Sequence, residues 1–311
     1  MKEASPSPAL SWVVLFGALS RTPHGVMDLA SPALAALLCL GTVPSFPLIA
    51  LGMLTAFAGY TAVYALNDIM DCRADRERIR RGGFRDTEMA VEGRFIRHPV
   101  ARDALSLGDG LTWVGLWAAA ALVGAWLLNP VCAAIFVAGA ALEAVYCLLL
   151  KVSHWRTLVH GVVKTCGALA AVFAVDPTPP PVYVLTLFLW LFFWEIGGQN
   201  IPADWHDLEE DKLLKARTMP LVLGLEKSGR AILAGLGISV VLGFVLGLTS
   251  PGRPRPASFA ALFAAGLFLL LAPAWRLYRS QKRREAGALF SRASFYPLAA
   301  FVIMAVDFIA R

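Results

Sequence analysis

Nine long apolar segments constrain the fold of this 311-residue chain more than any other feature of its sequence. A bilayer core about 30 Å thick needs roughly 20 apolar residues per spanning helix, and the segments are close to that length. Hydrophobic residues make up 58% of the chain and charged residues only 16%, at a mean hydropathy of +0.63. We therefore predict an all-α, polytopic integral membrane protein with nine transmembrane helices. The segments run approximately over 26–43, 47–66, 106–128, 131–150, 157–175, 182–203, 230–250, 257–277 and 288–310.

The connections between the segments fall into two alternating sets, and these sets define the topology. One set is rich in Pro, as in "VPSFP", "DPTPPP" and "SPGRPRP", and the other, together with Lys2 and Arg21 before the first segment, carries 25 of the 28 Lys and Arg residues. Because cytoplasmic loops hold the excess of basic residues, we expect the N-terminus inside and the C-terminus outside. Attraction to the lipid bilayer also accounts for the net charge of +6, so no nucleic-acid partner is expected.

The chain is expected to form one transmembrane domain over residues 1–311, with cytoplasmic cap loops at about 67–105 and 204–229. Its five Cys residues include no CxxC pair, so neither a disulfide framework nor a thiolate metal site is predicted. The N-terminal stretch has no clear charged region and cleavage site, which favours an interfacial lead-in over a signal peptide.

Two clusters of acids follow even-numbered segments. The first lies in "NDIMDCRADRERIRR", residues 67–81, where Asn67, Asp71 and Asp75 share one face of a helix at 100° per residue. Asp68 points about 100° away from Asn67. The second lies in "NIPADWHDLEEDK", after the sixth segment, and its acids form a tight stripe on an ideal helix. That stripe consists of Asn200, Asp204, Asp207 and Asp211.

Both clusters begin Asn-x-x-x-Asp on the predicted cytoplasmic side, so the two halves of the chain look like a degenerate repeat. Facing carboxylates repel unless a cation lies between them, and Mg²⁺ takes carboxylate oxygens, waters and phosphate oxygens together. Either cluster alone could be an ordinary solvated helix end, but two such clusters in equivalent positions of the chain favour a functional metal site. Lys151, on the same side, is an ordinary snorkelling anchor by itself and a partner for a diphosphate leaving group beside acids and Mg²⁺. The predicted metal ligands are Asn67, Asp71, Asp75, Asn200, Asp204, Asp207 and Asp211.

These motifs resemble those of the UbiA superfamily of intramembrane prenyltransferases over residues 10–310. The first matches NDxxDxxxD, the second resembles N-x-x-x-D-x-x-D-x-E-x-D-[RK] through Lys212, and "YCLLLK" places Lys151 on the family's basic residue. Three features depart from the family pattern: Lys215 replaces a Gly, Val152 replaces an Arg, and "EMAVEGRFIRHP" replaces the usual loop after the first motif. That loop could take part in acceptor recognition, so the departure leaves the acceptor open.

The resemblance implies Mg²⁺-dependent transfer of a polyprenyl group from a polyprenyl diphosphate to a small aromatic acceptor, such as 4-hydroxybenzoate or a related quinone precursor. It implies that the C–O bond ionises, that the acceptor attacks the allylic cation, and that a proton is then lost. The protein would lie in the inner membrane of a bacterium, and its active site would face the cytoplasm. The implied catalytic residues are Asp71, Asp75, Asp204, Asp207 and Asp211. The implied diphosphate-binding residues are Lys151, Lys212, Asn67 and Asn200.

Several polar and aromatic residues lie within the apolar segments. Glu143 and Glu195 are about two turns below the motifs, and an ionisable residue at that depth is by default a functional-site hypothesis. His160 and Lys164 are expected to make polar contacts near the membrane surface. Some aromatic rings could shield the cation with their π faces, although core or lipid packing explains each one singly. They are Tyr60, Tyr64, Tyr146, Trp190 and Trp194.

Two other membrane functions stay open at this point. A cation-coupled transporter would usually bind its ion near the bilayer midplane, and the acids here end helices at one face. A Mg²⁺-dependent phosphatidyltransferase-type enzyme would carry DGxxAR, whereas Asp71 is followed by "CRAD". Loop 67–105 contains nine Arg residues, and we expect it to close over the metal site and keep water from the cation.

Overall fold

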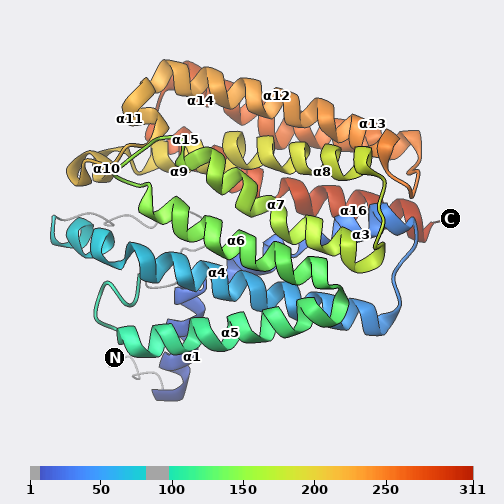
Figure 1. The fold of residues 1–311 in the computed structure, drawn as a ribbon. Helices are drawn as coiled ribbons and strands as arrows, with labels where there is room; N and C mark the ends of the chain where they lie inside the picture. Colours follow the sequence, from blue (N-terminus) through green and yellow to red (C-terminus); the bar gives the residue numbers. More distant parts are fainter. Residues whose placement is uncertain (1–7, 82–97, 311) are drawn as a thin grey trace, which may run out of the picture.

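The computed structural model describes residues 8–81 and 98–310, and every regular element in these ranges is helical. Nine helical stretches of the described chain are long and apolar enough to cross a membrane, as predicted. They run side by side, while α1 lies across them near one end of the bundle (Figure 1). The first elements are α1 (Pro8–Leu19), α2 (Thr22–Asp28), α3 (Ala30–Leu40), α4 (Phe46–Arg80), α5 (Leu107–Leu128), α6 (Pro130–Leu148), α7 (Arg156–Val175) and α8 (Pro181–Trp194). The remaining elements are η1 (Glu195–Asn200), α9 (Ile201–His206), α10 (Leu208–Leu214), α11 (Met219–Leu223), α12 (Leu225–Thr249), α13 (Pro256–Gly266), η2 (Leu267–Leu271), α14 (Ala272–Ser280), α15 (Arg283–Ser294) and α16 (Tyr296–Ile309).

The Pro-rich connections begin helices, as their composition suggests. Pro130, Pro181 and Pro256 each occupy the first position of a spanning helix, where the missing N–H costs no hydrogen bond. Asn129 caps α6, since its side-chain oxygen accepts a hydrogen bond from the Val131 N–H at 2.9 Å. The predicted breakers therefore locate the outer ends of the spans.

One boundary differs from the sequence-based expectation. The second span was expected to end at residue 66, with a cap loop from residue 67, but α4 continues to Arg80 and is 35 residues long. At 1.5 Å per residue this helix is about 52 Å long, so it extends well beyond a hydrocarbon core of about 30 Å. The first acidic motif thus lies on a rigid helical extension. The predicted lid falls mostly on residues 82–97, which lie outside the described residues.

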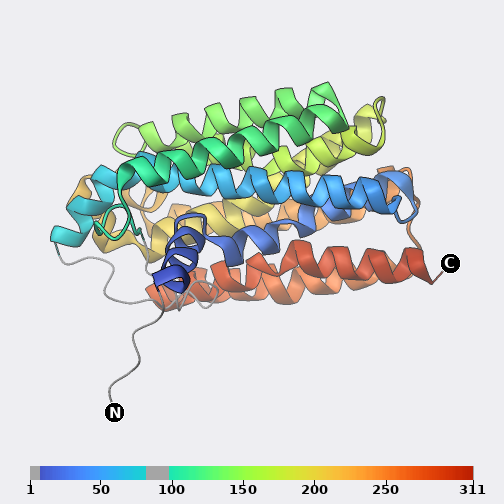
Figure 2. The same ribbon diagram turned by 90° about the horizontal axis from the view of Figure 1, so that it is seen from below.

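The main core surrounds α8. Tyr183, Leu187 and Trp190 are completely buried there, and the Tyr183 hydroxyl donates a hydrogen bond to the carbonyl oxygen of Ala35 at 2.7 Å. Large apolar side chains on the outside of the bundle, such as Leu127 and Phe268, are exposed. Exposed apolar surface of this kind suits contact with lipid. Lipid offers no hydrogen bonds to the backbone, so each spanning segment must satisfy its own N–H and C=O groups, as a helix does. Figure 2 shows the bundle from below, with α16 beside α3.

A six-residue π-helix, η1, continues α8 toward the end of the bundle, and all its residues are buried. Two glycines in it permit close packing. A Cβ on Gly197 would lie 2.9 Å from the Leu236 side chain, and one on Gly198 would lie 2.9 Å from Cβ of Ala293. Small residues let helices approach closely in membranes, so η1 packs directly against α12 and α15. Single π-helical turns of this kind often mark functional sites.

Candidate functional site

The first acidic motif lies in the last four turns of α4. Asp68 and Asp75 are buried, and Asp71 is partly buried. The Asn67 amide donates a hydrogen bond to Glu143 Oε1 at 2.6 Å, so this amide points away from the acids of its own motif. Asn67, Asp71 and Asp75 therefore do not act as one face: Asn67 bonds to Glu143, whereas Asp71 and Asp75 lie near Arg78.

The second motif was predicted as a stripe on one ideal helix, but it does not lie on one continuous helix. Asn200 ends η1, Asp204 lies in α9, and α9 breaks at Asp207 before α10 carries Asp211. Asn200, Asp204 and Asp211 are buried all the same, and Asp211 lies near Asp204 and Asp207 within electrostatic range. The break bends the chain so that α10 contacts α4 (Figure 1).

Arg78 connects the two motifs. Its guanidinium donates to Asp211 at 2.5 Å and lies 3.4 Å from Asp75, so an acid from each motif shares one cation. Arg78 also interacts electrostatically with Asp207 and Asp71. The sequence predicted that the two motifs face each other, and the structure brings their acids together around a basic residue that the sequence did not single out.

A second buried guanidinium, that of Arg156, also belongs to this cluster. It sits 3.9 Å from the ring centroid of Tyr146 and within electrostatic range of Asp204, Asp71 and Asp211. Nothing in the spacing of the sequence distinguishes Arg156 from the other basic residues of the cytoplasmic loops. For Arg78 the sequence does contain a signal, because Arg78 lies seven residues after Asp71 and therefore on the same helical face.

His98 joins the first motif from the loop that precedes α5. Its Nδ1 lies 2.7 Å from Asp68 Oδ1 and 2.8 Å from Asp75 Oδ2. Burial lowers the pKa of His98, but the neighbouring carboxylates of Asp75 and Asp68 outweigh it and raise that pKa to about 9. The three side chains also offer ligand atoms within 4.8 Å of one another, so the group has the composition of a metal site. In the sequence His98 is one residue of the stretch "EMAVEGRFIRHP", and no motif marks it as a partner of the acids.

The two lysines expected to bind diphosphate lie outside the cluster. Lys151 Nζ donates to Glu77 Oε2 at 3.1 Å, and Lys212 Nζ donates to Glu209 Oε1 at 2.8 Å. Their side chains are 49% and 52% exposed, so neither is held against the acids. Arg78 and Arg156 lie among the acidic side chains instead, together with His98.

Some buried oxygens in the cluster have no hydrogen-bond donor among the described residues. They include Asn200 Oδ1 and Asp204 Oδ2. Buried polar atoms are nearly always paired, so oxygens of this kind suit a bound cation. Burial raises the pKa of Asp211 to about 6, against the opposing effect of Arg78. Carboxylate and amide oxygens in this number match the hard, oxygen-rich ligand set that Mg²⁺ prefers.

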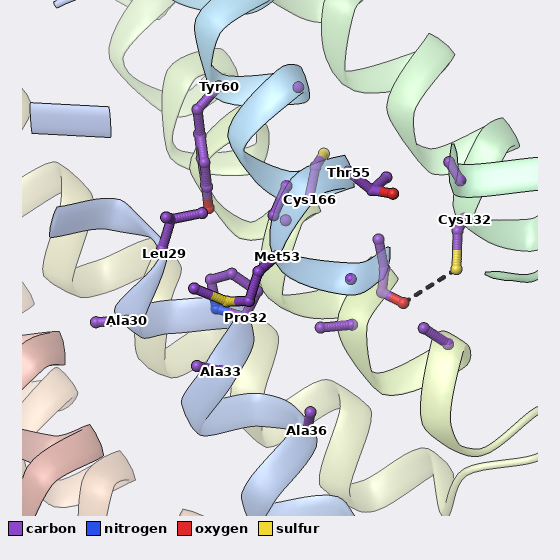
Figure 3. Close-up of a pocket in the computed structure, with 18 of the residues that line it drawn as sticks. Leu29, Ala30, Pro32, Ala33, Ala36, Met53, Thr55, Tyr60, Cys132 and Cys166 are labelled. Carbon is purple, nitrogen blue, oxygen red and sulfur yellow. Dashed lines mark hydrogen bonds between the residues drawn. The ribbon is translucent and has the colours of Figure 1, made fainter. Parts of the chain in front are cut away.

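An apolar cavity of about 610 Å³ lies within the bundle, and Glu143 in its wall accepts the hydrogen bond from Asn67 of the first motif. Its wall comes from α2, α3, α4, α5, α6, α7 and α16, and most of the side chains in it are aliphatic (Figure 3). Tyr60 points into it from α4 in Figure 3. The few polar lining residues include Tyr64, Glu143, His160 and Lys164. The cavity therefore suits a long apolar ligand with a polar head near the acids.

Two buried ionic networks lie where the cavity approaches the cluster. His160 lies 3.2 Å from Glu143 and 3.3 Å from Glu195, and Lys164 Nζ donates to Asp28 at 2.6 Å and to the Tyr64 hydroxyl at 2.7 Å. The expectation of near-surface positions for His160 and Lys164 is wrong, because both side chains lie in the cavity wall.

The aromatic residues named from the sequence divide into two groups. Tyr60 and Tyr64 line the cavity, and the Tyr146 ring lies 4.4 Å from the His160 ring. Trp190 and Trp194 belong instead to the core around α8, where Trp194 Nε1 donates to the Ala293 carbonyl oxygen at 2.9 Å. Core packing is therefore the better explanation for the two tryptophans.

Comparisons with known proteins agree on one family. The model of the UbiA prenyltransferase family matches residues 29–298. Protoheme IX farnesyltransferase 2 of Natronomonas pharaonis is 26% identical over 314 residues, covering 93% of this chain and 66% of that protein, somewhat less than two thirds of its length. Mitochondrial 4-hydroxybenzoate polyprenyltransferase of Rattus norvegicus is 27% identical over 185 residues, covering 60% of this chain and 48% of that protein.

The fold agrees with the same family. The solved structure of a UbiA homologue from Archaeoglobus fulgidus bound to DMAPP and Mg²⁺ superimposes with a TM-score of 0.65 at 14% identity. The match covers 94% of this chain and 99% of that one. At 14% identity this structural match shows only that the fold is shared. The family model, in contrast, matches the sequence itself over residues 29–298. The chain is an integral membrane protein and belongs to the UbiA prenyltransferase family.

Proposed function

We propose that the protein transfers a prenyl group from a prenyl diphosphate to an aromatic acceptor, with Mg²⁺ as cofactor, at the cytoplasmic face of a bacterial inner membrane. The observation that carries this proposal is the meeting of two acidic motifs beside an apolar cavity of about 610 Å³. A prenyl diphosphate has the matching form, since its head is polyanionic and its tail is apolar. The basic loops at the same end support the orientation toward the cytoplasm.

The oxygens of the two motifs would hold the cation. Asp71, Asp204 and Asp211 are the first candidates, because they surround the buried guanidiniums, and Asn200 and Asp204 have oxygens without donors. Asp75 shares Arg78 with Asp211, and Asp207 lies at the helix break beside them. When bound, Mg²⁺ would neutralise charge on the diphosphate oxygens.

The basic residues would stabilise the departing diphosphate. Arg156 and Arg78 are already held among the acids, and a planar guanidinium binds phosphate oxygens in a bidentate manner. Lys151 and Lys212 lie at the rim of this end of the bundle, and each would have to leave its glutamate to reach the ligand. A donor that gains strength as charge develops on the leaving oxygens accelerates ionisation.

The cavity would hold the prenyl tail and keep the reacting carbon dry. Aliphatic side chains from seven helices line it, so water is disfavoured along the tail. The Tyr60 and Tyr64 rings in the wall would stabilise the allylic cation by cation–π contact. For the acceptor we propose 4-hydroxybenzoate or a related quinone precursor, in line with the relative from Rattus norvegicus. The relative named protoheme IX farnesyltransferase makes protoheme IX the acceptor to test beside it.

The test is a transfer assay with purified protein in lipid nanodiscs. Labelled geranyl diphosphate and Mg²⁺ are supplied with 4-hydroxybenzoate, 1,4-dihydroxy-2-naphthoate or protoheme IX, and prenylated product is measured. We expect product with an aromatic acid and none after EDTA or in Asp204→Asn. Transfer to none of the three acceptors by folded protein would reject the proposal, and transfer to protoheme IX alone would replace the proposed acceptor.

A further inference from the structure

The most informative group beyond the acidic motifs is a triad of buried ionisable side chains, Glu143, His160 and Glu195. They come from three different elements, α6, α7 and η1. His160 Nδ1 lies 3.2 Å from Glu143 Oε2, and His160 Nε2 lies 3.3 Å from Glu195 Oε1. Ionisable groups buried in a membrane protein are costly, so a triad at this depth needs a functional reason.

The net charge of the triad follows from its contacts. The Nδ1–Glu143 contact is a hydrogen bond, and the Nε2–Glu195 contact is an ion-pair contact at 3.3 Å. Each of them needs one proton on its nitrogen or its oxygen, because two lone pairs at these distances would repel. Two protons shared among two carboxylates and one imidazole give a net charge of −1, wherever each proton resides. A third proton would find no acceptor: Glu143 Oε1 already accepts from Asn67 at 2.6 Å, and Glu195 Oε2 is buried without a partner.

Neighbouring groups do not cancel this charge. Lys164 is in electrostatic range of Glu195, but its ammonium is bonded to Asp28 at 2.6 Å and to the Tyr64 hydroxyl at 2.7 Å. Lys164 and Asp28 together are neutral, so they leave the excess charge on the triad. His24 Nε2 lies 3.9 Å from the other Asp28 oxygen, so its electrostatic interaction is with Asp28.

The triad lies where the prenyl diphosphate would change from polar head to apolar tail. Glu143 and His160 line the cavity, and Asn67, which bonds to Glu143, is one turn from Asp71 on α4. That turn is about 6 Å along the helix axis, so a diphosphate bound at Asp71 would place its first prenyl carbon near Glu143.

We propose that the Glu143–His160–Glu195 triad is an anionic wall that stabilises the allylic cation, an inference that rests on the prenyl transfer proposed above. When the bond between the prenyl C1 and its oxygen breaks, the electron pair leaves with the diphosphate and the positive charge spreads over C1 and C3. The triad transfers no proton in this step. Its fixed negative charge acts where positive charge develops, in a site with few competing water dipoles.

The test compares two probes that differ only in charge. Geranylamine is protonated at pH 7.5 and carries its charge beside C1, whereas geraniol is neutral, and each is supplied with inorganic pyrophosphate and Mg²⁺. The measured quantity is the ratio of the geraniol Kd to the geranylamine Kd in nanodiscs. We expect Glu195→Gln to lower this ratio by about tenfold, the effect of one unit charge at roughly 10 Å with an effective dielectric constant near 20.

Matched variants separate charge from packing. Glu195→Asp keeps the charge and should keep most of the preference, and Glu143→Gln should lose it as Glu195→Gln does. Glu226→Gln makes the same chemical change at an exposed pair with Arg230 and should leave the ratio unchanged. A ratio unchanged in Glu195→Gln, or equal losses of both probes, would overturn the triad proposal. Absence of prenyl transfer in the acceptor assay would overturn the proposed function, whatever the ratio.

Discussion

Arg78→Met is the substitution that most directly tests how the two motifs are held together. The side chain of Arg78 is 13% exposed, and its partners Asp75 and Asp211 are 1% and 2% exposed. Removing one partner of a buried ionic group leaves uncompensated charge and costs about 3–5 kcal/mol. At roughly 2 °C per kcal/mol for a chain of this size, we expect the Tm in EDTA to fall by about 6–10 °C.

Mg²⁺ should reverse much of this loss. In the wild-type protein the Arg78 guanidinium already compensates both acids, whereas in Arg78→Met they are available to a cation. A ligand at one hundred times its Kd stabilises the folded state by about 2.7 kcal/mol. The increase in Tm between EDTA and saturating Mg²⁺, measured by thermal unfolding in detergent, should therefore be larger for Arg78→Met than for the wild type.

Arg76→Met is the control on the same helix. Arg76 pairs with Asp103 at 2.7 Å, but the two side chains are 44% and 81% exposed, so the pair should contribute no more than about 1 kcal/mol. Equal losses of stability in Arg76→Met and Arg78→Met would refute the argument from burial. A Mg²⁺ response no larger than that of the wild type would refute the claim that Arg78 occupies the position of a cation.

Three further predictions concern single residues. Asp204→Ala should abolish most prenyl transfer while leaving expression and Tm close to those of the wild type; substantial turnover in this variant would remove Asp204 from the metal site. Lys151→Ala should lower kcat more than it changes KM, because charge on the leaving oxygens grows in the transition state; wild-type kinetics would leave Lys151 as a membrane anchor. His98 contributes stability that is complete below its unfolded pKa of about 6.5 and is lost as pH rises through about 9, since its folded pKa is raised. Unfolding of the metal-free protein between pH 6.5 and 9.5 should show this loss, and an identical pH slope in His98→Gln would contradict it.

The spans and their outer ends could be predicted because hydropathy and Pro placement act locally. The apolar run before Pro130 and the "DPTPPP" stretch before α8 each determine a boundary without help from distant residues. The inner end of α4 was mispredicted for the opposite reason. Hydropathy ends near residue 66, but the charged extension to Arg80 is helical because it packs on α5 and α10.

The candidate site was predictable in its carboxylates and poorly predictable in its cations. Paired Asn-x-x-x-Asp motifs stand out in sequence, whereas Arg78, Arg156 and His98 look like ordinary members of basic cytoplasmic loops. Their roles depend on contacts between residues far apart in the chain, such as Arg78 with Asp211. The burial of Lys164 could not be predicted for the same reason, because its partner Asp28 lies 136 residues earlier in the chain.

The π-helix at the end of α8 also sets an angle between two parts of the molecule. A π-helical turn contains one residue more than an α-helical turn, so it rotates the following chain by about 100° relative to an unbroken α-helix. Glu195 begins η1 and meets His160, and Asn200 ends it and donates to the Tyr146 hydroxyl at 3.3 Å. Deleting one residue of η1 would turn Asp211 away from Arg78 while leaving every carboxylate in the sequence. The number of residues in this buried segment is therefore under the same constraint as the identity of the acids that follow it.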